Sequence, residues 1–79
     1  MLTVYSKPDC IQCNFTTNLL DELEIPYEKR DVTQDEEALM AVKRAGYQAV
    51  PVVVTEEGYH WYGFRPEKIK GLLEGKIIL

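Results

Sequence analysis

Several features that common protein classes require are scarce in this sequence. Only two of its 79 residues are cysteine and only one is histidine, so a disulfide-rich scaffold is excluded and stability must come mainly from packing. No apolar run approaches the ~20 residues that span a bilayer, and the start of the chain lacks the basic residues and apolar stretch of a signal peptide. We therefore expect one domain, residues 1–79, located in the cytoplasm and without membrane contact.

An excess of positive charge is also missing. The formal net charge is −4, and the nine basic residues are scattered, so they form no stripe that could follow a phosphate backbone. Hydrophobic residues make up 46% of the chain, which argues against disorder. We therefore expect a globular monomer that does not bind nucleic acid.

The first part of the chain has the pattern strand, helix, strand. Residues 2–6 are β-branched and aromatic and predict a strand. After a break at residues 7–9, apolar residues at helical spacing predict a helix from Cys13 onward that ends before Pro26. Residues 27–32 predict a second strand, and their many charges suit the edge of a sheet.

A second helix has clear signals at both ends. Thr33 and Glu36 have the spacing of a capping box, and the acidic residues of the first turn complement the helix dipole. Lys43 and Arg44 do the same at its end. Gly46 stands where a helix C-terminus takes a left-handed residue.

The second part of the chain predicts a hairpin. Residues 50–54 are nearly all apolar, as expected of a strand buried on both faces. Residues 56–58 predict a turn, and residues 59–62 predict the partner strand. Alternate residues of this strand share a face, so one pair of its aromatic and histidine side chains is expected to be exposed.

A third helix follows and completes the fold. Pro66 fits its first position and Gly75 its end, and the apolar tail 76–79 is expected to pack against the domain. The inner stripe of this helix is expected to be Ile69, Leu72 and Leu73. The order β-α-β-α-β-β-α predicts an α/β fold in which a four-stranded mixed sheet is flanked by three helices, on both faces, with the first two strands parallel.

The chemistry is expected in the Cys10-Ile11-Gln12-Cys13 segment, where the first strand leads into the first helix. The amides at a helix N-terminus stabilise a thiolate, and two intervening residues let both sulfurs come within bonding distance. Cys10, at the exposed turn, is the expected nucleophile, and Cys13, inside the helix, is the expected resolving thiol. Lys7 adds positive charge nearby.

Three other interpretations of the two cysteines are weaker. A structural disulfide would close a loop too short to constrain the unfolded chain, in a compartment where such bonds are rare. A zinc site needs four ligands, whereas His60 is the only histidine and there is no second cysteine pair. The pair could also be coincidental. A strand–Cys-x-x-Cys–helix arrangement within a βαβ pattern favours redox chemistry over all three.

Pro51 is the second informative residue. It precedes a strand that reads as central, where proline is normally excluded. One interpretation is a cis Val50–Pro51 peptide in a loop beside the cysteines, with Val50 offering backbone groups to an extended substrate segment. The other is an ordinary proline at the start of a strand. The sequence leaves both open.

An aromatic and basic cluster, Trp61, Phe64 and Arg65, follows the hairpin. Core packing is the default for each aromatic residue. The functional alternative is that these residues bind a protein partner, because exposed aromatic residues and arginine dominate interaction hot spots. His60 is interpreted as a surface residue of the strand.

Together these motifs resemble the glutaredoxin-like NrdH-redoxins of the thioredoxin superfamily, over essentially the whole chain. The resemblance rests on residues 5–13 (YSKPDCIQC), 49–54 (AVPVVV) and 60–66 (HWYGFRP), and the last segment is much more specific than the cysteine pair. Two positions depart from the family pattern: Ile11 replaces a more familiar valine, and Tyr62 stands where a small serine is common.

The resemblance implies a thioredoxin/glutaredoxin-like fold and a redox-active disulfide. It implies electron transport from NADPH-dependent thioredoxin reductase to a ribonucleotide reductase, for deoxyribonucleotide synthesis. It gives Cys10 the nucleophile role, Cys13 the resolving role and Pro51 the cis-proline role, and it ties Trp61 and Phe64 to a structural network under the active-site surface. The expected substrate- or partner-binding residues are Lys7, Gln12, Val50, Pro51, Trp61, Phe64 and Arg65. No cofactor or metal is expected on this chain, because NADPH and FAD belong to the reductase.

Other functions remain as alternatives. The first is a glutathione-dependent glutaredoxin, which the family comparison disfavours because residues 61–64 stand where glutathione-binding members carry a Gly-Gly and acidic pair. The second is an iron–sulfur or zinc carrier with thiolates from two chains as ligands. The third is a non-catalytic adaptor that keeps only the fold.

Overall fold

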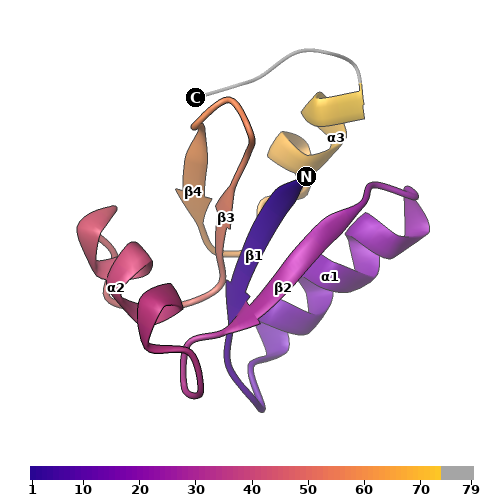
Figure 1. Cartoon of the computed structure of the whole chain (residues 1–79). Helices are drawn as coiled ribbons and strands as arrows, with labels where there is room; N and C mark the ends of the chain where they lie inside the picture. Colours follow the sequence, from indigo (N-terminus) through magenta and orange to yellow (C-terminus); the bar gives the residue numbers. More distant parts are fainter. Residues whose placement is uncertain (74–79) are drawn as a thin grey trace.

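A four-stranded mixed sheet forms the centre of the computed structural model, which describes residues 1–73 (Figure 1). The strands lie in the order β2-β1-β3-β4. β1 and β2 are parallel, whereas β1 pairs with β3, and β3 with β4, in antiparallel fashion. Their bounds are β1 Leu2–Ser6, β2 Tyr27–Asp31, β3 Val52–Val54 and β4 His60–Tyr62. The predicted edge position of the second strand and the central position of the third are both confirmed.

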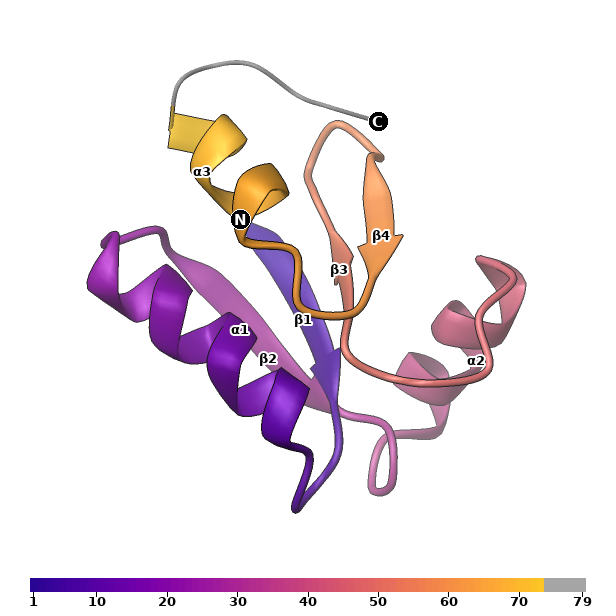
Figure 2. The same ribbon diagram turned by 180° about the vertical axis from the view of Figure 1, so that it is seen from behind.

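Three helices cover the two faces of this sheet. Their bounds are α1 Ile11–Glu22, α2 Glu36–Arg44 and α3 Pro66–Leu73. α1 and α3 lie on one face and α2 lies on the other, as the two opposite views show (Figures 1 and 2). The element order and the mixed sheet confirm the predicted α/β fold, including the parallel pairing of the first two strands.

Each face of the sheet has its own core. Under α1 and α3, the buried side chains are Leu2, Val4, Leu20, Val53, Trp61 and Ile69. Under α2, they are Tyr5, Cys13, Ala38, Val42, Val50 and Val52. Alternation along β1 divides its side chains between the two cores, because successive residues of a strand point to opposite faces. The second core contains one of the two cysteines, so the reactive end of the molecule is packed against α2 as well as α1.

Helix α1 begins earlier than the apolar spacing predicts. It starts at Ile11, with Cys10 as its N-cap residue, and its C-cap is Leu23, before Pro26 as predicted. The apolar spacing did not reveal the first turn, because Ile11 is exposed and does not lie on the buried face of the helix. Both cysteines therefore lie in the opening turn of the helix.

The predicted capping box at the start of α2 is wrong. The N-cap residue is Asp35, whose side chain accepts a hydrogen bond from the amide of Ala38 at 3.1 Å. Thr33 does not cap the helix, because its amide and its hydroxyl both donate to Asp31 Oδ1, at 2.8 and 2.6 Å. The end of the helix is as predicted, with Gly46 at a φ of +92°.

The predicted inner stripe of α3 is wrong at one of its three residues. The helix begins at Pro66 as expected, Ile69 is fully buried and Leu72 is half-buried. Leu73 is instead 57% exposed and does not belong to the inner stripe. The predicted helix end at Gly75 and the predicted packing of residues 76–79 lie outside the described residues.

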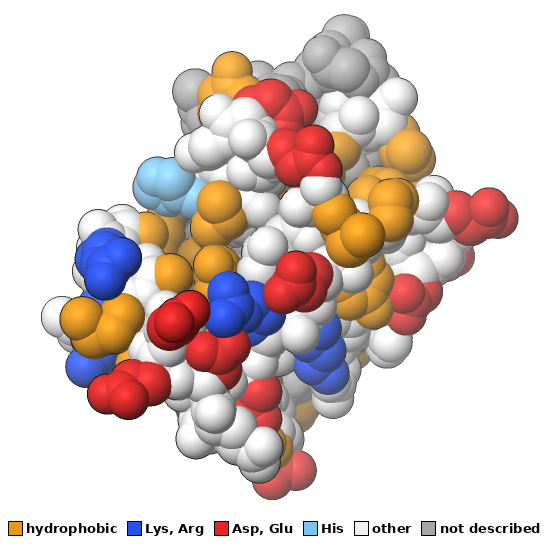
Figure 3. All heavy atoms as spheres, viewed as in Figure 1, with side chains coloured by type: hydrophobic (Ala, Val, Ile, Leu, Met, Phe, Trp, Pro, Cys, Tyr) orange, Lys and Arg blue, Asp and Glu red, His pale blue; other side chains and the backbone are white. Residues whose placement is uncertain are grey.

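The charged residues on the face seen in Figure 3 are interspersed, with acidic and basic side chains side by side. Arg30 on β2 illustrates this pattern, since its guanidinium group bonds Asp35 Oδ2 at 2.6 and 3.0 Å. Within residues 1–73, no helix has the length and apolar character needed to cross a membrane.

Candidate active site

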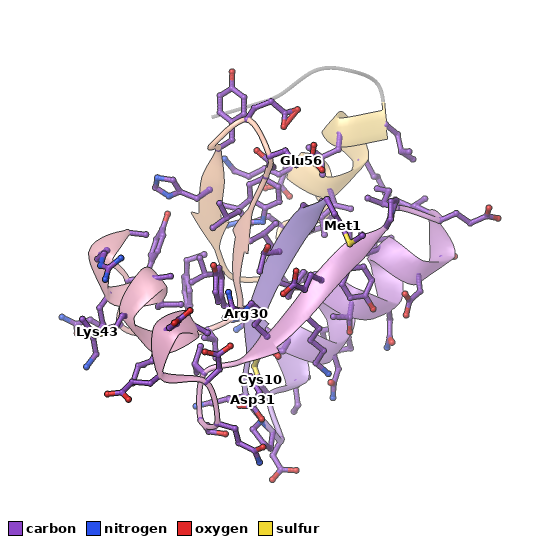
Figure 4. All side chains as sticks on the ribbon, viewed as in Figure 1. Met1, Cys10, Arg30, Asp31, Lys43 and Glu56 are labelled. Atoms are coloured by element: carbon purple, nitrogen blue, oxygen red, sulfur yellow. A yellow bond between two sulfur atoms is a disulfide. The ribbon has the colours of Figure 1, made fainter. Side chains whose placement is uncertain are left out.

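The cysteine pair lies at the end of the sheet where β1 leads into α1 (Figure 4). Cys10 and Cys13 are joined by a disulfide, and their Cα atoms are 5.2 Å apart. Cys10 is half-buried, whereas Cys13 is only 1% exposed. Just before the pair, Asp9 has a φ of +60°, a conformation that short polar residues tolerate and that turns the chain from strand to helix.

The sulfur of Cys10 caps helix α1. It accepts a hydrogen bond from the amide of Cys13 at 3.2 Å, while the carbonyl oxygen of Cys10 accepts from Asn14 at 3.1 Å. The first amides of a helix have no partner within the helix and carry the positive end of its dipole. No acidic side chain lies in the first turn of α1 to oppose this field. This arrangement favours negative charge on the Cys10 sulfur.

The segment before β3 lies against the cysteines. The Val50–Pro51 peptide is cis, so the first of the two interpretations of Pro51 is confirmed in this respect. The carbonyl oxygen of Val50 is 3.9 Å from the Cys10 sulfur, and both Val50 and Pro51 are buried. Pro51 also accepts a hydrogen bond from the amide of Gly63 at 2.8 Å. The role of Val50 in binding an extended substrate stays a prediction.

The link between β4 and α3 forms the third side of the site. The Gln12 side-chain oxygen accepts a hydrogen bond from the amide of Phe64 at 3.2 Å. Gly63 has a φ of +89°, which favours glycine at this bend. The ring of Phe64 rests against that of Phe15, with centroids 5.6 Å apart. Gln12 and Phe64, predicted as separate site residues, are thus brought together.

The other two members of the aromatic and basic cluster lie differently. Trp61 is buried in the core under α1 and α3, and Lys68 lies 5.9 Å from its ring centroid. The indole Nε1 of Trp61 has no hydrogen-bond partner among residues 1–73. Arg65 is exposed, and its Nε donates to the carbonyl oxygen of Tyr62 at 3.3 Å. Core packing therefore applies to Trp61, while Arg65 remains at the surface.

Lys7 lies at a small slot beside the cis-proline segment. The cavity has a volume of about 170 Å³, and Lys7, Lys43 and Val50 line it together with apolar residues of α2. Val50, which lines this slot, also approaches the Cys10 sulfur with its carbonyl oxygen.

Two exposed apolar residues of α1 escaped the sequence reasoning. Ile11 is 70% exposed and Phe15 is 51% exposed, so two apolar side chains of α1 lie at the surface near the disulfide. The only signal in the sequence was their i, i+4 spacing, which places them on one face of the helix. His60 is exposed as predicted, and its Nδ1 lies 2.8 Å from the hydroxyl of Tyr47.

Two carboxyl groups at and after the end of β2, Asp31 and Asp35, have lowered pKa values. The hydrogen bond from Arg30, and the amide of Ala38 after it, lower the pKa of the Asp35 carboxyl below its ordinary value of 3.8. The hydroxyl and amide of Thr33 lower the pKa of Asp31 in the same way. In the part of the chain that the structure describes, no group of three or more His, Cys, Asp or Glu side chains could hold a metal ion.

Comparison with known proteins places this geometry in context. The glutaredoxin family model matches residues 2–61. The glutaredoxin-like protein NrdH of Lactococcus lactis subsp. lactis is 35% identical over 72 residues, which cover 91% of this chain and 99% of the relative. The NrdH-redoxin of Escherichia coli, a glutaredoxin-like protein with a thioredoxin-like activity profile, has a solved structure that matches with a TM-score of 0.83. It is 32% identical, and the match covers 90% of this chain and 92% of that one. A buckwheat glutaredoxin–glutathione complex matches with a TM-score of 0.69 at 28% identity, covering 96% of this chain and 71% of that one.

Proposed function

Because the chain belongs to the glutaredoxin-like NrdH-redoxin family, we propose that it donates electrons to a ribonucleotide reductase and is itself reduced by thioredoxin reductase. The general activity, thiol–disulfide exchange, follows from the family and from the disulfide between Cys10 and Cys13. One observation supports Cys10 as the attacking thiolate: its sulfur lies at the N-terminus of α1 and accepts a hydrogen bond from the amide of Cys13.

The donor half-reaction starts from the reduced dithiol. The Cys10 thiolate attacks one sulfur of the partner's disulfide, a mixed disulfide forms, and the partner's other sulfur leaves as a thiolate. Cys13 then loses its proton and attacks the Cys10 sulfur, which releases the partner's second thiolate. Two electrons pass to the partner, its two thiolates take up from solvent the two protons that Cys10 and Cys13 released, and the Cys10–Cys13 disulfide forms. The burial of Cys13 suits the resolving role, because it can reach Cys10 but not a protein partner.

The return half-reaction runs the same exchange backwards with a reductase dithiol as electron source. NADPH and flavin belong to that reductase, and this chain needs no cofactor of its own. The thiolate that starts each cycle is stabilised by the helix N-terminus and by the Cys13 amide.

A coupled assay tests the proposal. NADPH, thioredoxin reductase and a ribonucleotide reductase should support deoxyribonucleotide formation when this protein is added. We expect Cys10→Ser to abolish turnover and Cys13→Ser to accumulate a mixed disulfide with the partner. Full activation of the partner by the double serine variant would contradict the proposal and indicate an adaptor instead.

A glutathione-linked activity is the second candidate, and one observation favours it. The slot beside Val50 is flanked by two lysines, Lys7 and Lys43, which suit an anionic tripeptide, and the fold matches a glutaredoxin–glutathione complex. The same assay with glutathione and glutathione reductase in place of thioredoxin reductase separates the two candidates. Equal rates in both systems would favour the second.

A further inference from the structure

Gln12 joins two segments that lie far apart in the sequence. It is the second residue between the cysteines, and its side-chain oxygen accepts the amide hydrogen of Phe64, 52 positions away. Its side chain also lies close along the bend of the β4–α3 link, since a β-carbon built on Gly63 would be 3.4 Å from the same oxygen. The opening turn of α1 is thus tied by a side chain to the β4–α3 link, residues 63–65.

The β4–α3 link is held from two sides. The amide of Gly63 donates to the carbonyl oxygen of Pro51 at 2.8 Å, and the amide of Phe64 donates to Gln12 at 3.2 Å. The first bond fixes the link to the cis-proline segment, and the second fixes it to the cysteine turn. The ring of Phe64 then rests on Phe15, two residues after Cys13.

We propose that Gln12 is a positioning residue for thiol–disulfide exchange with protein substrates, an inference that rests on the proposed function. Gln12 does not act on the reacting sulfur atoms. Its hydrogen bond holds Phe64 in the surface that a protein must cover when its disulfide meets Cys10. A preformed surface binds more tightly because no ordering cost is left to the encounter. This assigns Gln12 a different role from the direct partner contact that the sequence predicts.

Two variants separate positioning from direct contact. Gln12→Met keeps the length of the side chain and removes the acceptor, whereas Gln12→Glu keeps an acceptor oxygen and removes the amide NH₂. Gln34→Met is the matched control, because Gln34 is an exposed glutamine on the link between β2 and α2. The first measurement is hydrogen exchange of the Phe64 amide by NMR on the oxidised protein. The second is the KM and kcat for insulin as a protein disulfide, with dithiothreitol as reductant.

In Gln12→Met we expect the Phe64 amide to exchange about fivefold faster and the KM for insulin to rise about fivefold, the worth of one ordinary hydrogen bond. We expect kcat to hold. Gln12→Glu should restore both quantities to within about twofold of wild type, and Gln34→Met should change neither.

Each contrary result has a definite meaning. Unchanged exchange at Phe64 in Gln12→Met, or an unchanged KM, would overturn the inference. A Gln12→Glu variant as impaired as Gln12→Met would show that the NH₂ group contacts the substrate directly, which also overturns it. Insulin and dithiothreitol are independent of the proposed reductase and of ribonucleotide reductase. Failure of the proposed function would therefore appear in the coupled assay, and failure of this inference here.

Discussion

Truncation of Ile69 to alanine should destabilise the protein severely, because this side chain anchors α3. Ile69 is 0% exposed and lies in the core with Leu20, Val53 and Trp61. The change removes three carbon atoms, and at ~0.8 kcal/mol for each buried carbon the lost transfer free energy is about 2.4 kcal/mol. The cavity left behind adds to this, so we expect a total loss of about 3–4 kcal/mol in the free energy of unfolding.

This loss is large for a chain of this size. Stability of ~0.05–0.15 kcal/mol per residue predicts a free energy of unfolding of about 4–12 kcal/mol for the whole protein. Each kcal/mol lowers the midpoint of thermal unfolding of so small a domain by ~4–8 °C, so the expected fall is roughly 12–30 °C. The consequence reaches the site, because α3 follows directly on the link that carries Phe64.

Urea unfolding of the oxidised protein, followed by circular dichroism, measures the effect. Leu73→Ala is the matched control: it is an aliphatic truncation on the same helix, but the side chain is 57% exposed, so we expect a change within ~0.5 kcal/mol. Equal losses in the two variants would refute the assignment of Ile69 to the core and of Leu73 to the surface. So would a loss below about 1 kcal/mol for Ile69→Ala with an unchanged m-value.

Three further predictions concern the surface, the response to acid and metal binding. Phe15→Ser should raise the KM for a protein disulfide several-fold to about tenfold, because an exposed aromatic residue beside the disulfide is a typical hot spot. Met40→Ser, which removes an exposed apolar side chain from α2, should leave this KM unchanged. Equal effects of the two variants would contradict a role of Phe15 in substrate binding. Arg30 lowers the pKa of Asp35 below its ordinary value of 3.8. At a pH above 3.8 the ionised Asp35 carboxylate therefore stabilises the folded state, and this stabilisation is lost as the pH falls through the lowered pKa. Asp35→Asn, which retains a good N-cap type, should therefore flatten the dependence of the urea midpoint on pH between about pH 5 and pH 2, and an unchanged slope would contradict the linkage. Treatment with EDTA should leave the thermal midpoint unchanged and the purified protein colourless, whereas a fall in the midpoint or a visible absorbance would point to a metal or iron–sulfur carrier.

Local patterns were sufficient to predict where the cysteine pair lies. The strand of residues 2–6, the break after it and the Cys-x-x-Cys spacing are all features of one short stretch, and they correctly placed the two cysteines at a strand–helix junction. The left-handed Gly46 and the exposed charged edge strand were predicted in the same way. In each case the physical cause, whether a dihedral angle, a helix dipole or a strand edge, acts within a few residues.

The start of α2 shows where local patterns fail. Thr33 and Asp35 are both good capping residues, and the spacing from Thr33 to Glu36 favoured the first. Two contacts determine that Asp35, and not Thr33, is the N-cap residue. Asp31 binds both the amide and the hydroxyl of Thr33, and Arg30 binds the carboxylate of Asp35. Both partners lie in or at the end of β2, so the competition could be resolved only once the position of that strand was known.

The site itself depends on contacts that no local pattern contains. Cys10 and Cys13 are three positions apart, yet the turn that holds them contacts distant parts of the chain. Val50 lies 40 positions from Cys10, whose sulfur it approaches, and Phe64 lies 52 positions from Gln12, to which it donates. The sheet order explains why these segments meet: β3 pairs with β1 beside the cysteine turn, and β4 pairs with β3, so the ends of three strands converge there. The position of the two sulfurs is therefore encoded locally, whereas the distant segments around the cysteine turn are brought there by the order of the strands. Variants that leave the cysteines intact but loosen the β4–α3 link should accordingly alter the choice of substrate before they alter the exchange reaction.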